Sequence, residues 1–160
     1  MKYINKGFTL IELLVVVGII SILSILVLVA VNPAKRLADA RDARRGGDIN
    51  QVLTGIHECI IDKKDSSSMS TCLGSTTTGN TYEIVSGAIT SGCQASCPGA
   101  TSDSSCLPLD TTLSDYFVTL PTDPGGVTTG HTGYSVTVYS NGMVVIEACK
   151  AENGTIKVSR

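Results

Sequence analysis

The stretch that decides the fold lies at the N-terminus, where residues 6–31 read KGFTLIELLVVVGIISILSILVLVAV. From Leu13 to Val31 there are 19 consecutive residues without a charged side chain. As an α-helix they would be about 28 Å long, close to the ~30 Å hydrocarbon thickness of a bilayer. The remaining chain is too polar and acidic to wrap a helix that is apolar on every side. The sequence therefore predicts a membrane-spanning helix rather than a buried core helix.

Charge and composition differ between the two ends of the 160-residue chain. Residues 1–45 carry seven Lys or Arg and three Asp or Glu, whereas residues 46–160 carry five and eleven, so balances of +4 and -6 add to the net -2. Aromatic residues make up only 4% of the chain. An acidic C-terminal part with few rings suits neither phosphate binding nor base stacking, so no nucleic-acid partner is predicted.

The residues ahead of the apolar run distinguish it from an ordinary secretory signal, whose apolar core has about 7–15 residues and is followed by a small-x-small cleavage site. Here the run is longer, and the large Leu28 lies two residues before the best candidate site at Ala30. Cleavage behind the run is therefore unfavourable. The segment is expected to stay attached.

A short basic leader ending in Gly7, then Phe8-Thr9-Leu10-Ile11-Glu12 and an unbroken apolar helix, resembles the N-terminus of type IV prepilins and of type II secretion pseudopilins. The resemblance implies that a prepilin peptidase cuts between Gly7 and Phe8 and methylates the new N-terminus at Phe8. It also implies a homo-oligomeric helical filament, built at an inner-membrane assembly platform from subunits stored in membrane lipid.

Glu12 has two interpretations that the sequence leaves open. A carboxylate at the centre of a bilayer-spanning helix costs about 2.5–3.5 kcal/mol and usually has a partner. By the family resemblance, that partner is the Phe8 ammonium of a neighbouring subunit, which sets the axial register. Alternatively, Thr9-x-x-Glu12 matches the capping box, in which Glu12 closes the first turn of its own helix.

The expected organisation has four parts: a leader 1–7, a transmembrane and assembly helix 8–31, an amphipathic helix 32–65, and a loop-rich, disulfide-stapled region with a C-terminal sheet, 66–160. The chain is expected in the cytoplasmic (inner) membrane before assembly and in a surface filament afterwards, or in the periplasm if it is a pseudopilin. Counting basic residues on either side of the span would instead place the C-terminal side in the cytoplasm. The leader motif and the cysteines favour export.

Helical spacing continues beyond the span. Asn32-Pro33 suits either a helix restart or a kink in one long helix. The Gly46-Gly47 pair is expected to form a bend or a close helix contact, and the alternating charges of 35–48 either a solvated face or pairs between subunits. The helix is expected to end at Lys63-Lys64-Asp65. The apolar stripe predicted to lie on a sheet comprises Ala34, Ala38, Ile49, Val52, Leu53, Ile56 and Ile60.

Three strands are predicted near the C-terminus, at 134–139, 143–149 and 155–158, with a tight turn at Asn141-Gly142 between the first two. One more strand is expected at 82–85, inside a segment of loop composition where 25 of the 47 residues 66–112 are Gly, Ser or Thr. A long helix across a small antiparallel sheet is an α+β roll, which is also the fold that the resemblance implies.

The segment Leu120-Pro-Thr-Asp-Pro-Gly-Gly126 resembles the LPxDPxG segment of major pseudopilins and many pilins, but has Gly125 where an aromatic is common. The resemblance makes Asp123 a weak calcium candidate. Calcium needs six to eight oxygen ligands, and only this carboxylate is close by in sequence, so a Pro-Asp-Pro-Gly turn is favoured and no cofactor is expected.

All six cysteines follow the apolar run, and their even number in an exported domain predicts disulfides. The pairing cannot be deduced from the sequence, although Cys59 with Cys72 is the favoured pair. Cys93-x-x-x-Cys97 is a short spacing that could hold a metal, but no histidine is near it in sequence. The six disulfide candidates are Cys59, Cys72, Cys93, Cys97, Cys106 and Cys149.

No enzyme is predicted, because the chain has no P-loop, G-x-S-x-G or H-E-x-x-H motif. His57 and His131 are expected to be exposed or packing residues. The sequence therefore predicts a structural subunit of a type IV pilus-like filament. A secretion pseudopilin and a membrane-anchored surface binding module that does not polymerise are the alternatives.

Overall fold

The computed structural model describes residues 7–64, 68–74 and 76–160. Lys2 and Lys6 of the expected leader and Asp65 lie outside the described residues. The chain divides into two compact units, of which the first ends at Leu37 and the second comprises Ala38–Arg160. Each unit has its own reason to fold.

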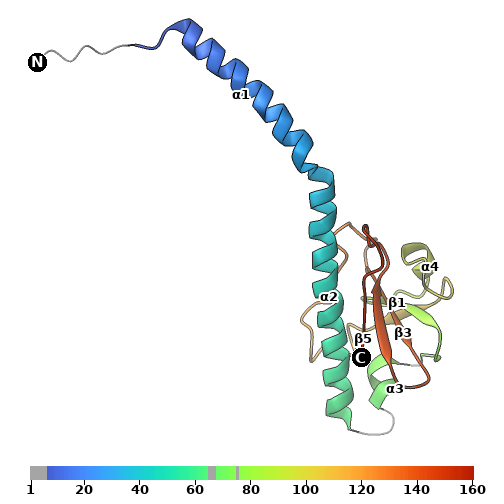
Figure 1. The fold of residues 1–160 in the computed structure, drawn as a ribbon. Helices are drawn as coiled ribbons and strands as arrows, with labels where there is room; N and C mark the ends of the chain where they lie inside the picture. The colour runs from blue at the N-terminus through green and yellow to red at the C-terminus, as the bar shows by residue number, and fades with distance from the viewer. Residues whose placement is uncertain (1–6, 65–67, 75) are drawn as a thin grey trace, which may run out of the picture. The chain divides into compact units, whose positions relative to one another are not determined.

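The first unit contains helix α1, Leu10–Val31, which is helical along its whole length (Figure 1). Its 22 residues include none that is buried. Asn32 ends it with a left-handed φ of +44°, and its side chain accepts a hydrogen bond from the Lys35 N–H at 3.4 Å. Helix α2, Pro33–Lys63, begins directly afterwards. Asn32-Pro33 is therefore a helix restart, with a polar cap followed by proline at the first helical position.

Helix α2 continues through Gly46 and Gly47 without a break, contrary to the expected bend. A Cβ built on either glycine meets no described atom within 4 Å, so the expected close contact is also absent from the described part of the chain. The helix ends at Lys63, as predicted. The predicted stripe is buried at Ile49, Val52, Leu53 and Ile56, whereas Ala34 is exposed.

The second unit contains one five-stranded sheet in the order β2-β1-β3-β4-β5. Strands β3, β4 and β5 form the predicted antiparallel meander, with Val136 opposite Ile146 and Ile146 opposite Val158. Strand β1 pairs antiparallel with β3 and parallel with β2. The sheet is thus mixed rather than wholly antiparallel, and the α+β class is confirmed. The strands are β1 Thr81–Val85, β2 Cys106–Pro108, β3 His131–Val138, β4 Val144–Ala148 and β5 Lys157–Ser159.

The turn after β3 differs from the prediction by one residue. The Gly142 N–H donates to the Tyr139 carbonyl at 3.0 Å, so Ser140 and Asn141 are the central residues of this turn. Gly142 follows them with a φ of +83°, a conformation that side chains rarely tolerate. Asn-Gly therefore serves here as the end of a turn rather than as its centre.

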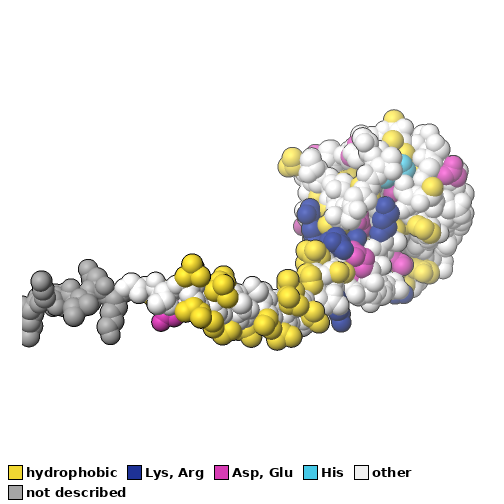
Figure 2. Space-filling model, turned by 90° about the horizontal axis from the view of Figure 1, so that it is seen from above, with side chains coloured by type: hydrophobic (Ala, Val, Ile, Leu, Met, Phe, Trp, Pro, Cys, Tyr) yellow, Lys and Arg dark blue, Asp and Glu magenta, His cyan; other side chains and the backbone are white. Residues whose placement is uncertain are grey.

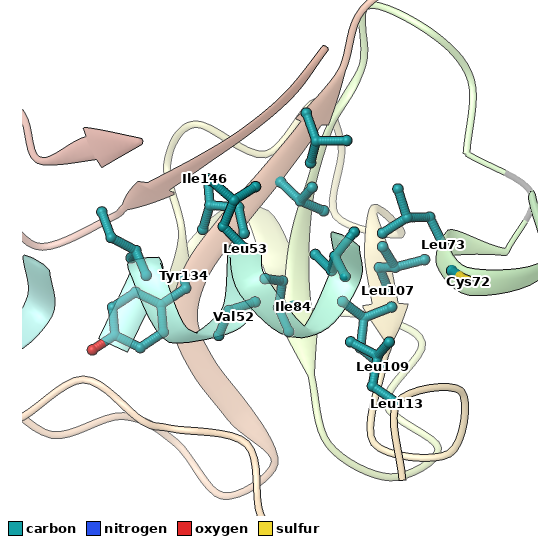
Figure 3. Close-up of a cluster of buried hydrophobic side chains, with 14 of the residues drawn as sticks. Val52, Leu53, Cys72, Leu73, Ile84, Leu107, Leu109, Leu113, Tyr134 and Ile146 are labelled. Carbon is teal, nitrogen blue, oxygen red and sulfur yellow. The ribbon is translucent and has the colours of Figure 1, made fainter. Parts of the chain in front are cut away.

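The core of the second unit lies between α2 and the sheet, where Val52 and Leu53 meet Ile84, Tyr134 and Ile146 (Figure 3). Leucines of the connecting segments complete it, among them Leu73 of α3, Ser68–Leu73, and Leu109 and Leu113 after β2. A short helix, α4 at Cys93–Ser96, precedes β2. The Gly/Ser/Thr-rich segment is therefore partly ordered by apolar anchors.

Three disulfides join the connecting segments to regular structure. Cys59 of α2 bonds to Cys72 of α3, the pairing favoured from sequence. Cys93 bonds to Cys106, and Cys97 bonds to Cys149 across 52 residues. The six candidate cysteines are therefore all paired. Each bridge is worth about 2–4 kcal/mol through the loop that it closes.

Candidate functional site

Helix α1 exposes its apolar side chains all round its axis. Leu13, Ile20 and Leu26 are each more than half exposed, and Figure 2 shows hydrophobic side chains along its visible face. The helix is long and apolar enough to cross a membrane, at about 33 Å for its 22 residues. Side chains with no partner in their own chain require either lipid or other helices around them.

The serine hydroxyls of α1 are satisfied within the helix itself. The Ser21 hydroxyl donates to the Val17 carbonyl at 2.7 Å, and the Ser24 hydroxyl donates to the Ile20 carbonyl at 2.8 Å. An unpaired hydroxyl in hydrocarbon costs several kcal/mol. With these bonds made, the surface of α1 from Leu13 to Val31 offers almost only apolar atoms to its surroundings.

At the start of α1, Thr9 and Glu12 form the capping box. The Thr9 N–H and hydroxyl donate to Glu12 Oε2 at 2.8 and 2.7 Å, and the Glu12 N–H donates to the Thr9 hydroxyl at 3.3 Å. Among the described residues, Glu12 Oε1 receives no hydrogen bond. Phe8 next to this box is 90% exposed. The intramolecular interpretation of Glu12 is realised in a single chain, and one carboxylate oxygen remains available to a second.

The second polar site joins α2 to two loops of the same unit. We call it the Arg45 cluster, and it comprises Arg41, Asp42, Arg45, Asp123 and Glu152. Arg45 is fully buried, and its Nε and Nη2 donate to Asp123 Oδ2 and Oδ1 at 2.7 and 2.9 Å. Its Nη1 donates to Asp42 at 2.7 Å and to Glu152 at 2.9 Å. One guanidinium thus ties α2 to the loop before β3 and to the loop after β4.

Ionisation in the Arg45 cluster follows from these contacts. Hydrogen bonds from Arg41 and Arg45 lower the pKa of Glu152 to about 2. Burial opposes the ionisation of Asp42, but hydrogen bonds from the Glu152 N–H, Arg45 and Asn153 still lower its pKa to about 2. Hydrogen bonding to Asp123 raises the pKa of Arg45. Asp42, Glu152 and Arg45 therefore stay ionised at neutral pH.

Asp123 does not fit a calcium ligand. Its two oxygens already accept from the Arg45 guanidinium, and Oδ1 also accepts from the Gly125 N–H at 2.7 Å. A positive guanidinium stands where a cation would have to bind. A Cβ at Gly125 would lie 2.9 Å from Arg45 Nη2, which explains why a glycine rather than an aromatic suits this position.

For the charges of 35–48, the sequence predicts either a solvated face or pairs between subunits. The Arg45 cluster fits neither prediction, because its ion pairs lie within one chain. Asp48 likewise accepts from the Tyr134 hydroxyl at 2.7 Å, and burial raises the pKa of that tyrosine. Arg44 alone of the three neighbouring arginines is mostly exposed, 3.9 Å from Asp48. Asp123 is 78 residues from Arg45, so no spacing rule could reveal their pairing.

The two histidines differ in their surroundings. His57 on α2 is half-buried, and burial together with Arg160 lowers its pKa. His131 begins β3 rather than lying in a loop, is only 7% exposed, and has Nδ1 2.9 Å from Glu83 Oε2. Of the two expected alternatives, exposed or packing, the structure shows the packing one for His131, whose ring also pairs with a buried carboxylate.

Comparison with known proteins gives two findings. The family described as the prokaryotic N-terminal methylation motif matches residues 4–28. The type IV major fimbrial protein FimA of Dichelobacter nodosus is 32% identical over 99 residues, which cover 62% of this chain and 60% of the relative. No solved structure matches the chain. The matched motif includes most of the exposed apolar helix α1, and the chain spans about 60% of the length of the fimbrial relative that it resembles.

Proposed function

We propose that the chain is a structural subunit of a type IV pilus-like filament and that it polymerises through residues 8–31. The observation that carries this proposal is that α1 has 22 residues and buries none of them. Lipid surrounds such a helix before assembly, and the helices of other subunits surround it afterwards. The change of surroundings costs little, since both are apolar and the serine hydroxyls already have partners.

Maturation is part of the proposal. A prepilin peptidase removes residues 1–7 by cutting between Gly7 and Phe8, and Phe8 becomes the N-methylated first residue. The inner-membrane assembly platform then receives the helix 8–31, while 32–65 and 66–160 form the exported part. The exposure of Phe8 and the absence of any described atom near a Cβ at Gly7 support access to this bond.

A pilus is favoured over a secretion pseudopilin. Three disulfides secure an exported region rich in Gly, Ser and Thr, which suits a filament surface outside the cell. The matched relative is itself described as a major fimbrial protein. A surface filament rather than a periplasmic one is therefore expected, with a scaffolding role rather than catalysis.

Two measurements test the proposal. Mass spectrometry of the protein from its own cells should find an N-methylated Phe8 as the first residue, and sheared surface fibres should contain this chain. An intact N-terminus would favour the surface module that does not polymerise. Mature protein confined to short periplasmic assemblies would favour the pseudopilin.

The role of Glu12 is separable from the capping box by matched variants. Thr9→Ala and Glu12→Ala both remove the box, but only Glu12→Ala removes the carboxylate that is proposed to meet the Phe8 ammonium of a neighbour. Fibre yield should therefore fall much further in Glu12→Ala than in Thr9→Ala. Equal fibre yields in the two variants would mean that Glu12 acts only as a helix cap. The proposal that the chain polymerises through residues 8–31 would still stand.

A further inference from the structure

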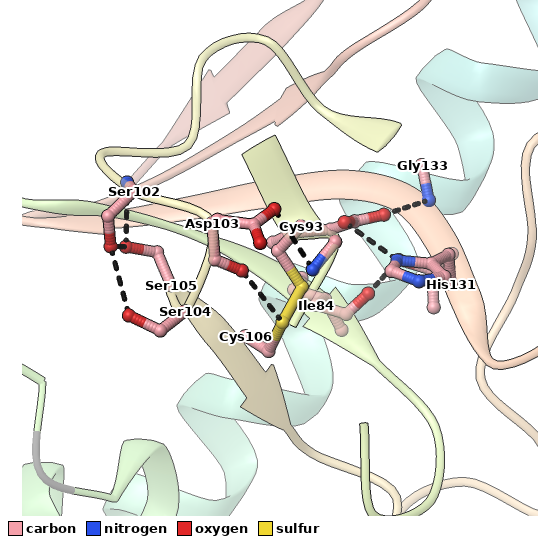
Figure 4. The surroundings of a disulfide bond; sticks show 12 residues. Ile84, Cys93, Ser102, Asp103, Ser104, Ser105, Cys106, His131 and Gly133 are labelled. Carbon is pink, nitrogen blue, oxygen red and sulfur yellow. Dashed lines mark hydrogen bonds and ion pairs between the residues drawn. A yellow bond between two sulfur atoms is a disulfide. The ribbon is translucent and has the colours of Figure 1, made fainter. Parts of the chain in front are cut away.

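Glu83 of β1 and His131 of β3 form a buried pair beside a disulfide. Glu83 is fully buried, and its Oε1 accepts from the Gly133 N–H at 3.3 Å while Oε2 lies 2.9 Å from His131 Nδ1. The register of β1 with β3 shifts between Glu83 and Val85 at this place. Figure 4 shows His131 and Gly133 on one side of the Cys93–Cys106 bond and Ser102–Ser105 on the other.

The sulfur of Cys93 lies close to both side chains of the pair. The ligand atoms of Glu83, Cys93 and His131 all lie within 4.8 Å of one another, and all three residues are buried. Gly92, next to Cys93, would bring a Cβ within 3.7 Å of His131 Nε2, so the ring also borders the start of α4. Spacing in the sequence does not reveal this cluster of three side chains, because 38 residues separate Cys93 from His131.

Stability alone gives no strong reason for a carboxylate and an imidazole at this place. A buried charge pair often contributes less to stability than apolar side chains of similar volume. The Arg45 cluster already ties the sheet to α2, whereas Glu83 and His131 lie on neighbouring strands that are paired by backbone hydrogen bonds. A carboxylate, an imidazole and a sulfur are, however, the ligand types that zinc prefers.

We propose that Glu83, Cys93 and His131 bind a zinc ion when the Cys93–Cys106 disulfide is reduced. In the disulfide, the Cys93 sulfur is a poor ligand, because metal binding requires a thiolate. Reduction adds two electrons and two protons to the bond, supplied by a dithiol that becomes a disulfide. Zinc then binds the Cys93 sulfur and displaces its proton to solvent. Three protein ligands leave the fourth tetrahedral position to water.

Metal and disulfide are therefore alternatives at one place in the chain. Two electrons leave the two cysteine sulfurs for a disulfide acceptor when the Cys93–Cys106 bond forms, and the zinc ion is then released. The metal-bound form belongs to chains that have not yet been oxidised. The metal would hold α4 against β1 and β3 before the covalent bond does so.

Cobalt titration of full-length chain in detergent micelles tests this directly. Cys106→Ser frees the Cys93 thiol without a reductant, and Cys72→Ser is the matched control, because it frees Cys59 at another disulfide. Cys106→Ser should bind one Co²⁺ with a sulfur-to-cobalt charge-transfer absorption that zinc abolishes, and Cys72→Ser should not. No such absorption in Cys106→Ser that retains the circular dichroism of the parent would overturn the proposal.

Two further measurements keep the test decisive if Cys106→Ser does not fold. Wild-type chain reduced with a phosphine, which is oxidised to its oxide by water and the disulfide, should show the same absorption, whereas the unreduced chain should not. His131→Gln in the Cys106→Ser background should lower zinc affinity at least about tenfold, as the loss of a metal-site residue does. Unchanged affinity, or equal absorption before and after reduction, would contradict the proposed ligands.

Discussion

Helix α1 and the unit Ala38–Arg160 satisfy the same physical requirements in opposite ways. The larger unit buries its own apolar side chains, pairs its buried charges and closes its loops with three disulfides. Helix α1 satisfies its backbone and its hydroxyls but leaves every side chain at least partly exposed. The larger unit buries its apolar side chains within a single chain, whereas α1 requires lipid or other helices around it.

This contrast indicates where substitutions should act. Changes inside Ala38–Arg160 should appear as stability of the isolated subunit, whereas changes on α1 should leave that stability alone and alter insertion and assembly. Each of the following experiments therefore measures one or both of these quantities in the full chain. A variant that moved both equally would weaken the separation.

The largest effect on stability is expected from Arg45→Met. This substitution leaves Asp123 buried without its partner and removes contacts to Asp42 and Glu152. Loss of one partner of a buried pair costs about 3–5 kcal/mol of unfolding free energy, measurable by urea denaturation. Arg44→Met is the control, since the Arg44 side chain is mostly exposed and lies 3.9 Å from Asp48, and should cost less than about 0.5 kcal/mol. Similar losses in both variants would contradict a special role of the Arg45 cluster.

Ile20→Arg should act on α1 alone. An arginine near the middle of the span costs about 2.5–3.5 kcal/mol on insertion scales, so membrane-bound protein and sheared fibres should both decrease. Ile61→Arg is matched, because Ile61 on α2 is 64% exposed and Ile20 is 56% exposed. It should leave fibres and stability unchanged. If Ile61→Arg reduced fibres as strongly, exposure in the single chain would not identify the assembly surface.

Acid should weaken the larger unit. The pKa values of Asp42 and Glu152 are about 2 in the folded chain, against ordinary values of 3.8 and 4.5. The unfolded chain therefore takes up protons first, and stability that is present above about pH 5 is lost as the pH falls toward 2. Thermal unfolding at a series of pH values should show this decrease. Asp42→Asn with Glu152→Gln should flatten it, and an unchanged slope would mean that other groups govern acid sensitivity.

The smallest effect is expected from Gly47→Ala. The glycine lies within α2 with no described atom near a Cβ, so alanine should stabilise the subunit by about 1 kcal/mol through helix propensity alone. Urea denaturation measures this gain. If fibre yield falls at the same time, Gly47 contacts another subunit. The assembly surface then includes part of α2 as well as α1. A loss of subunit stability would instead show that alanine meets a contact within its own chain.

Local patterns predicted much of this molecule. The length and purity of residues 13–31 predicted α1, and the period-two alternation after Tyr134 predicted the meander. The Thr9-x-x-Glu12 spacing indicated the capping box as one of two interpretations of Glu12. Each of these signals is carried by residues that are neighbours in the sequence. Each prediction therefore needs only the geometry of one helix or of one pair of adjacent strands.

Long-range pairings were not predictable in the same way. Strand β2 has three residues and no alternation, and it pairs with β1 from within a segment of loop composition. Arg45 meets Asp123, and Cys93 lies near His131, because α2 and α4 pack against the sheet. Charge and residue type indicated that these groups need partners, but the topology decides which ones.

The Cys97–Cys149 bond has a consequence for resistance to proteolysis. It encloses β2, β3 and β4 within one covalent loop. A protease that cuts the chain once anywhere between these cysteines produces two pieces that remain bonded to each other. A nicked subunit would keep its strands in place, and the fibre would lose neither mass nor continuity at that point.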